Sequence, residues 1–280
     1  MSERMLSLAA GVLPEFTPQQ MAAAAAGSGW PAVGIWVEPA TWTRAVAQEV
    51  RRRTDDAGVA LLDVEVVWIK PGVDDPDHFR IVDAGADIGA ANVLVVSSDP
   101  DPGATAAKLA RLVDHAADCG LRVSLEFGAF TAVRNLAAAL DILARAERPG
   151  AGLLVDPLHL ARTGGAPSAL AGVDPRRFAY AQFCDAAASG PSPDDVAGII
   201  EEALDLRLMP GEGALPLEAL LDVLPPATPL SVELRSKALR DAYADPTERA
   251  KALLAATRAA LARGATGSRT DRGSASSSAR

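Results

Sequence analysis

Short apolar runs recur along this chain at intervals of about 25–30 residues, and segments with helical spacing lie between them. Runs that are hydrophobic throughout, without alternation, are typical of strands buried on both faces. Strands that alternate with helices indicate a parallel sheet covered by those helices. Eight such units favour a closed barrel over an open, doubly wound sheet. The runs cover residues 5–10, 32–37, 59–69, 92–98, 121–127, 151–160, 178–186 and 229–236.

The segments between the runs carry helix signals at their ends. Thr17 is suited to cap a helix that follows it, and Gly27 is suited to end that helix. The longest interval, 187–228, is expected to hold an extra loop above the barrel mouth as well as a helix. Further helices are expected over residues 41–57, 76–89, 103–119, 131–147 and 246–263.

The length of the chain agrees with a single barrel. It has 280 residues, and a TIM barrel typically takes about 250. No GxGxxG motif follows the first run, which argues against a dinucleotide-binding fold. We therefore predict the α/β class and a (β/α)8 TIM barrel that forms one domain over residues 1–263. Residues 264–280 are rich in Ser, Gly and Arg and are expected to form a disordered C-terminal tail.

Charge and composition limit the partners that the chain can have. The net charge is -9 and the sequence pI is near 4.9, so the surface should repel nucleic acid. No apolar run reaches the roughly 18 residues of a membrane span, and the N-terminal stretch lacks the basic region of a signal peptide. The two cysteines, Cys119 and Cys184, form no redox or metal motif, and Cys184 is expected to be a buried thiol. A cytoplasmic protein is predicted.

Polar residues stand at the ends of the last four apolar runs. In a TIM barrel the carboxyl ends of the strands form the active-site face, so side chains at these ends should meet. Four successive strands thus deliver oxygen-bearing side chains to one half of the barrel mouth. In chain order these are Glu126, then Asp156, then Gln182 with Asp185, and finally Glu233 with Arg235.

Carboxylates that converge in this way need a positive charge among them. Two like charges about 4 Å apart repel by about 4 kcal/mol at an effective dielectric of about 20. One divalent cation would remove this repulsion, and oxygen donors suit Mn²⁺ or Mg²⁺, with Co²⁺ or Zn²⁺ also compatible. The alternative is that each acid acts alone, as a helix cap or as an ion-pair partner.

Several segments from residue 121 onward resemble the xylose-isomerase-like sugar phosphate isomerase/epimerase family. They are SLEF, LLVDPLHLARTGG, YAQFCDA, RLMPGEG and SVELRS, and the resemblance extends over roughly residues 5–262. Its most diagnostic part is the D-x-x-H pair of Asp156 and His159, with Arg162 and the glycines at 164–165 after it. The resemblance implies a xylose-isomerase-like TIM barrel.

The resemblance also implies a ligand set for the metal. In the family the ion is held by Glu, Asp, His or Gln, and Glu from four successive strands, which correspond here to Glu126, Asp156, Gln182 and Glu233. Many members have His at the third position. The Gln of this chain is similar to inosose isomerases and 3-dehydroshikimate dehydratases. Endonucleases of the family use several metals and many more histidines than the three found here, which argues against that activity.

The reaction that the resemblance implies begins next to a carbonyl group. A bound divalent ion acts as a Lewis acid on the substrate oxygens and acidifies the neighbouring C–H. Glu126 or Glu233 then removes the proton as general base, giving an enediolate. Reprotonation at the other carbon gives isomerisation, and on the opposite face it gives epimerisation. Loss of a β-hydroxyl gives dehydration, so three outcomes remain open.

Supporting roles are predicted for residues near the mouth. His159 is expected to act catalytically on the substrate or to hold another site residue; a loop histidine bonded to the backbone is the alternative. Arg235 is expected to bind a carboxylate or phosphate of the substrate, and pairing with Asp185 is the alternative. His78 and His115 lie on expected helices and are predicted at the surface.

A second group of residues is expected to line the pocket. Arg207 and Glu212 flank the PGEG turn and are predicted to form a lid or to contact substrate, although turn flexibility alone also explains the glycines. Trp36 and Trp68 lie near strand ends and are predicted to wall the pocket, with core packing as the alternative. Glu65 lies in the third run and is a candidate for the barrel lumen.

The chain is therefore expected to be a metal-dependent isomerase or epimerase of a sugar, an inosose or a related polyhydroxy ketone. The alternative enzyme is a dehydratase of the 3-dehydroshikimate type, whose keto acid substrate needs an arginine. A non-catalytic barrel, acting as a subunit or a ligand-binding protein, is a third interpretation. GxSxG and P-loop motifs are absent, which argues against a nucleophilic hydrolase and an ATP-dependent enzyme. A homo-oligomer is compatible with the sequence.

Overall fold

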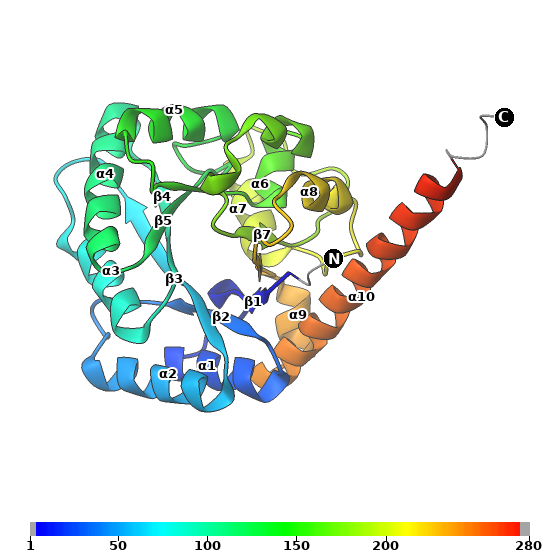
Figure 1. The fold of residues 1–280 in the computed structure, drawn as a ribbon, viewed down its shortest axis with the longest axis horizontal. Helices are drawn as coiled ribbons and strands as arrows, with labels where there is room; N and C mark the ends of the chain where they lie inside the picture. The colour runs from blue at the N-terminus through cyan, green and yellow to red at the C-terminus, as the bar shows by residue number, and fades with distance from the viewer. Residues whose placement is uncertain (1–3, 275–280) are drawn as a thin grey trace.

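A computed structural model describes residues 4–274, and the side chains of residues 4–263. Eight parallel strands form one sheet in the order β6-β5-β4-β3-β2-β1-β8-β7 (Figure 1). Each predicted apolar run contributes one strand. The strands are β1 Leu6–Leu8, β2 Ala32–Trp36, β3 Ala60–Ile69, β4 Asn92–Ser97, β5 Arg122–Glu126, β6 Gly152–Leu154, β7 Ala181–Phe183 and β8 Leu230–Val232.

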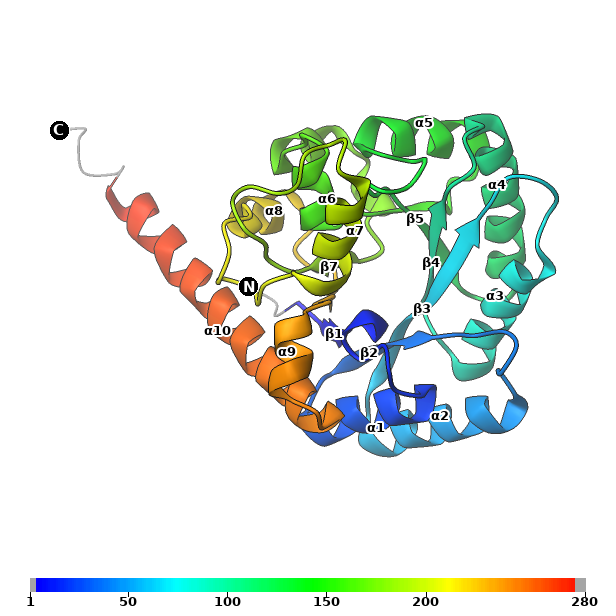
Figure 2. The same cartoon turned by 180° about the vertical axis from the view of Figure 1, so that it is seen from behind.

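The sheet curls into a nearly closed barrel. Strands β6 and β7 stand at the two ends of the strand order, and a backbone hydrogen bond joins them: the Gln182 N–H donates to the Val155 carbonyl at 3.0 Å. Helices surround this ring of strands, as the view from behind also shows (Figure 2). The predicted (β/α)8 architecture is therefore confirmed.

The helices lie between the strands in the expected alternation, and the last one, α10, extends away from the barrel (Figure 1). Three short 3-10 helices, η1 to η3, lie in the loops. The helices are α1 Pro18–Ser28, α2 Arg44–Ala57, α3 Pro76–Ile88, α4 Pro102–Asp118, α5 Leu136–Ala146, α6 Pro157–Arg162, α7 Val196–Asp205, α8 Leu217–Val223, α9 Lys237–Ala242 and α10 Pro246–Ser274, with η1 Ala10–Val12, η2 Pro167–Gly172 and η3 Pro175–Arg177.

The helices differ from the sequence prediction at several places. Thr17 caps α1 in a capping box with Gln20, as expected, but the helix runs past Gly27 and ends at Gly29, where φ is 80°. Only Gly adopts such a positive φ without strain, which makes Gly29 the better stop. Helix α5 begins at residue 136 instead of 131, because Asn135 caps it through the Ala138 N–H. The interval 187–228 holds two helices, α7 and α8, where one was expected.

The expected disordered tail at 264–280 falls on residues whose side chains lie outside the described part, and 275–280 lie outside the described residues altogether. The tail and the domain bound at 263 therefore stay predictions. Within the described residues, no helix combines the length and the apolarity that a membrane crossing requires.

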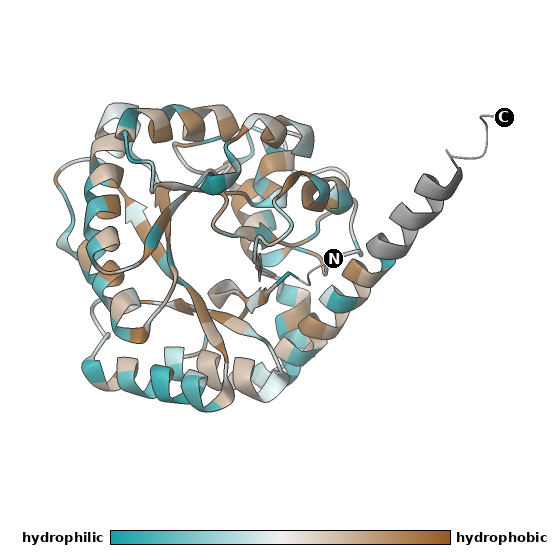
Figure 3. Ribbon diagram, in the orientation of Figure 1, coloured by the Kyte–Doolittle hydropathy of each residue, from teal (hydrophilic) through white to brown (hydrophobic). Residues whose placement is uncertain are grey.

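Most apolar burial lies between the strands and the inward faces of the helices (Figure 3). The barrel interior is different, because several polar side chains stand among its apolar ones. Ser231 of β8 pairs in register with Ser7 of β1 and Gln182 of β7, and all three are at most 1% exposed. This polar interior lies directly beneath the strand ends and forms the floor of the candidate site.

Candidate active site

The strand ends place the four predicted oxygen donors at one rim of the barrel. Glu126 is the last residue of β5, Gln182 lies in β7, and Glu233 follows β8 directly. Asp156 stands two residues after β6 and caps α6, its carboxylate accepting the Leu158 N–H at 2.7 Å. Each of the four is at least 93% buried, so their charges strongly influence one another.

Glu126, Asp156 and His159 have the chemistry and proximity that a divalent ion requires, whereas Glu233 does not belong to this close group. Ligand atoms of Glu126, Asp156 and His159 all lie within 4.8 Å of one another. The side-chain oxygen of Gln182 is buried, and the described residues supply it no hydrogen-bond partner. Two carboxylates and an imidazole this close together fit a cation of the Mn²⁺, Mg²⁺ or Zn²⁺ type. The buried, unpartnered amide oxygen of Gln182, whose backbone N–H bonds to the residue before Asp156, is a further candidate ligand.

A buried arginine supplies positive charge at the same place. Arg207 contacts Oδ2 of Asp156 through Nη1 at 2.5 Å and Oε2 of Glu233 through Nη2 at 3.1 Å. Its Nε donates to the Ala203 carbonyl at 2.8 Å, and the residue is 3% exposed. The sequence predicted that Arg207 forms a lid or contacts substrate; in the structure its guanidinium lies between Asp156 and Glu233, and a substrate contact stays a prediction. It partly neutralises the acids that were expected to depend on a metal alone.

The pKa values follow this charge arrangement. Burial, and next the charges of Glu233 and Asp156, raise the pKa of Glu126 well above its usual range. Burial would also raise the pKa of Asp156, but the neighbouring Arg207 and His159 outweigh it and lower that pKa. Burial lowers the pKa of His159. Asp156 is thus held as a carboxylate and His159 as a neutral imidazole, the forms in which both can bind a metal.

Arg235 lies at the mouth in contact with two other candidate residues. Its Nε is 3.4 Å from Oε1 of Glu233, and its guanidinium lies over the Trp36 ring, 5.6 Å from the ring centroid. The alternative pairing with Asp185 is not seen. Gly11 allows this packing, because a Cβ there would lie 2.6 Å from Nε of Arg235. The Arg235 side chain is 18% exposed, so part of the guanidinium remains accessible from the mouth.

Asp185 organises the PGEG loop. Its carboxylate accepts the N–H groups of Gly211, Gly213 and Leu215 at 2.9–3.0 Å, and also that of Ala186. The loop approaches so closely that a Cβ on Gly213 would lie 2.2 Å from the Ala186 carbonyl oxygen. Only glycine fits there, which explains this part of the motif by packing. Glu212, at the tip of the loop, is exposed.

An aromatic row connects the third strand to His159. Phe130 packs edge-on against the His159 ring at 5.3 Å, and the Trp68 ring lies 6.4 Å from Phe130. The Trp68 indole donates to the Ser98 hydroxyl at 2.7 Å.

The prediction that His78 lies at the surface is wrong: it is 9% exposed, and its Nε2 is 3.0 Å from the Trp68 carbonyl oxygen. His115 is half-exposed, near the surface as predicted.

Beneath the rim lies a buried acidic pair of which only one member was singled out. Asp63 and Glu65 both lie in β3 and are at most 2% exposed. Burial raises the pKa of Asp63 to about 7. Burial, and then the charges of Asp63 and Glu233, raise the pKa of Glu65 well above its usual range. Burial and these same acids raise the pKa of Tyr180 as well.

Sequence reasoning missed Asp63, Tyr180 and Phe130. Asp63 stands in a continuous apolar run, where a single acid gives no periodic signal that it faces the lumen. Phe130 lies in a loop, four residues after β5, and its contact with His159 depends on the path of that loop. An acid inside a buried strand was the one signal that pointed toward Asp63.

The comparisons with known proteins agree with this geometry. A family profile described as "Xylose isomerase-like TIM barrel" matches residues 22–260. A search of curated proteins found no sequence match. Solved structures give matches over nearly the whole chain, at identities low enough that they show the fold alone.

Three of these structures are informative. A "xylose isomerase-like TIM barrel/4-hydroxyphenylpyruvate dioxygenase fusion protein" is 22% identical with TM-score 0.76; the match covers 95% of this chain but only 45% of that one. The IOLI protein "with a binding zinc atom" is 15% identical with TM-score 0.73, covering 93% and 97%. The "probable 3-DHS dehydratase AsbF" from Bacillus anthracis is 12% identical with TM-score 0.66, covering 89% and 98%.

Proposed function

Since this chain belongs to the xylose isomerase-like TIM barrel family, we propose that it is a metal-dependent isomerase or epimerase. Its substrate would be a sugar, an inosose or a related polyhydroxy ketone that loses a proton next to its carbonyl group. One observation carries the proposal: Glu126, Asp156 and His159 bring ligand atoms within 4.8 Å of one another, and the side-chain oxygen of Gln182 is buried without a partner.

Glu126, Asp156, Gln182 and Glu233 would hold the ion, with His159 as a further donor. When bound, a divalent ion supplies Lewis acidity toward the substrate oxygens. A protein of the same fold was solved with a bound zinc atom, which supports a metal in this chain as well, and Mn²⁺ and Mg²⁺ suit the oxygen donors. The identity of the ion is part of the proposal.

The chain's own carboxylates would move the proton. Glu126 is favoured as general base because burial and its acidic neighbours raise its pKa, which makes its carboxylate a stronger base. Glu233 can serve as the second acid–base group on the other side of the substrate. Arg207 would hold Asp156 and Glu233 in place through its ion pairs. Trp36 and Trp68 would form walls of the substrate pocket. Arg235 and Glu212 would contact the substrate.

Solvent deuterium exchange tests the proposal. Purified protein is first analysed for bound metals and then incubated in D₂O with a panel of ketoses and inososes. We expect about one equivalent of divalent metal, and deuterium entering one ketose without loss of water, only in metal-loaded protein. Metal-loaded protein that exchanges no ketose proton and dehydrates no keto acid would contradict the proposal and favour a non-catalytic barrel.

A second candidate is a dehydratase acting on a keto acid, and the position of Arg235 favours it. The partly exposed guanidinium at the mouth can bind a substrate carboxylate bidentately. The substitution Arg235→Ala separates the two functions, because only a substrate with a carboxylate needs this guanidinium. If the variant turns over 3-dehydroshikimate at least 100-fold less efficiently than the wild type, with little change on neutral ketoses, the enzyme is the dehydratase.

The proposal includes the location and the partners of the enzyme. We propose that it is cytoplasmic, acts on a small molecule and binds neither nucleic acid nor membranes. The acidic net charge supports the exclusion of nucleic acid. A homo-oligomer is compatible with the fold.

A further inference from the structure

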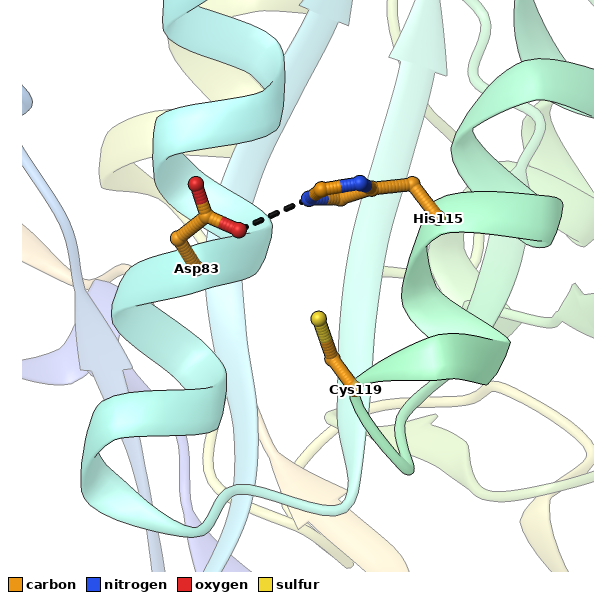
Figure 4. Close-up of side chains that lie close together, drawn as sticks. All are labelled: Asp83, His115 and Cys119. Atoms are coloured by element: carbon orange, nitrogen blue, oxygen red, sulfur yellow. Dashed lines mark hydrogen bonds and ion pairs between the residues drawn. The ribbon is translucent and has the colours of Figure 1, made fainter.

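Two outer helices, α3 and α4, bring together a second set of side chains that can bind a metal (Figure 4). Asp83 lies on α3, His115 lies on α4, and Cys119 caps the C-terminal end of α4. Their donor atoms all lie within 4.8 Å of one another. Neither the strand-end chemistry nor the fold requires these three residue types at this place.

The three side chains point toward one another from two helices (Figure 4). His115 and Cys119 are four residues apart, which puts both on the same face of the end of α4. Nε2 of His115 lies 2.7 Å from Oδ1 of Asp83 across the gap between the helices. The Phe79 ring packs edge-on against the imidazole, with centroids 5.2 Å apart and planes at 88°. The imidazole is therefore oriented from two sides before any ion binds.

The donor types select one class of ion. A thiolate, an imidazole and a carboxylate together match Zn²⁺, with bonds of about 2.0–2.3 Å that place tetrahedral donors about 3.5 Å apart. The Asp83 side chain is 56% exposed and that of His115 36%, so both can rotate by the small amount required. The C-terminal end of α4, where Cys119 lies, adds negative potential that favours a cation.

We propose that Asp83, His115 and Cys119 form a zinc site on the outer surface of the barrel, with water as the fourth ligand. Binding replaces the His115–Asp83 hydrogen bond with two metal bonds: the neutral imidazole exchanges its Nε2 proton for one on Nδ1 through solvent, and the Cys119 thiol releases its proton to solvent. The ion then joins α3 to α4. This site is independent of the strand-end metal, because it shares no residue with it.

Alkylation of Cys119 in the native protein tests the site. Cys119 is partly exposed and Cys184 is fully buried, so iodoacetamide reports on Cys119, and mass spectrometry of peptides verifies this. We expect micromolar Zn²⁺ to slow the labelling of Cys119 at least tenfold. His115→Asn and Asp83→Asn should abolish most of that protection. Asp118→Asn is the matched control, since it removes the same charge one residue from the thiol, and protection should remain.

A zinc count provides the second measurement. After dialysis against Zn²⁺, Cys119→Ser should hold one equivalent less than the wild-type chain, whether or not the strand-end site is loaded. A failure of the proposed enzyme activity therefore leaves this difference unchanged. Equal zinc content in the two proteins, or protection in His115→Asn that equals the wild type, would overturn the site.

Discussion

Arg207 is the residue that most changes the electrostatics of the candidate site. Its guanidinium lies between Asp156 and Glu233 and is 3% exposed, so the acidic cluster already contains one fixed positive charge. Burial opposes that charge, but the two acids outweigh it and raise the pKa of Arg207 well above its usual range. A bound ion and Arg207 would therefore both neutralise the negative charge of Asp156 and Glu233.

Replacing Arg207 should cost stability that a metal ion can restore. Arg207→Met removes the buried cation from Asp156 and leaves Glu233 with only the partly exposed Arg235, and breaking a buried ion pair typically costs about 3–5 kcal/mol. Urea denaturation measures the free energy of unfolding with and without Mn²⁺, and we expect Mn²⁺ to stabilise the variant more than the wild type. Arg235→Met, at the partly exposed pair with Glu233, is the control and should cost about 1 kcal/mol or less. Equal Mn²⁺ stabilisation in variant and wild type would show that the ion and Arg207 do not act on the same charges.

Replacing Glu126 should remove the base while leaving the fold intact. Glu126→Gln keeps the side-chain size but cannot accept a proton, and general-base catalysis contributes about 10²–10⁴-fold. We expect proton–deuterium exchange on the best ketose to fall by at least 100-fold, with an unchanged far-UV spectrum. Glu218→Gln, an exposed acid in α8, serves as the control. Exchange that survives in Glu126→Gln but is lost in Glu233→Gln would transfer the role of base to Glu233.

At the scale of elements, the apolar runs predicted all eight strands and their order along the chain. Periodicity identifies a buried strand because its whole length is hydrophobic. Hydrophobic periodicity gives no information about the path of a loop. For this reason α8 and the loop that brings Phe130 to His159 were not predicted. Candidate residues at strand ends were found because the fold itself places them. The ion pairs of Arg207 with two acids of the site were not predicted, because its position depends on the backbone bonds of the segment after α7.

The loop from 211 to 215 should depend on Asp185. Its carboxylate accepts three loop N–H groups, and Asp185→Asn leaves one acceptor oxygen for them, at a cost of about 0.5–1.5 kcal/mol for each partly buried hydrogen bond that is lost. We expect faster amide hydrogen exchange at residues 211–215 and weaker substrate binding. Glu212→Gln, exposed in the same loop, should leave the exchange rates unchanged. Slow exchange in Asp185→Asn would show that Gly213 packing alone orders the loop.

At the scale of the whole molecule, the stability of the fold depends on the buried acids Asp63 and Glu65 in the barrel interior. The pKa of Asp63 is raised to about 7 in the folded protein because the residue is buried, whereas an unfolded aspartate has a pKa near about 3.9. Between these values the folded state holds a proton that the unfolded state has lost. The free energy of unfolding therefore falls as pH rises through this window, by at most about 1.4 kcal/mol per pH unit for one group.

Removing this acid should flatten the pH dependence of stability. Asp63→Asn has no proton to lose, so its free energy of unfolding should fall less steeply between about pH 4 and 7 than that of the wild type, and the variant should gain relative stability above pH 7. Some slope should remain, since the raised pKa values of Glu65 and Glu126 act in the same direction. Urea unfolding at half-unit steps of pH, with a chelator present, measures how the free energy of unfolding depends on pH. Asp222→Asn, at an exposed position, is the control. Parallel curves for Asp63→Asn and the wild type would mean that Asp63 is ionised throughout, and that cationic partners or water reach the barrel interior.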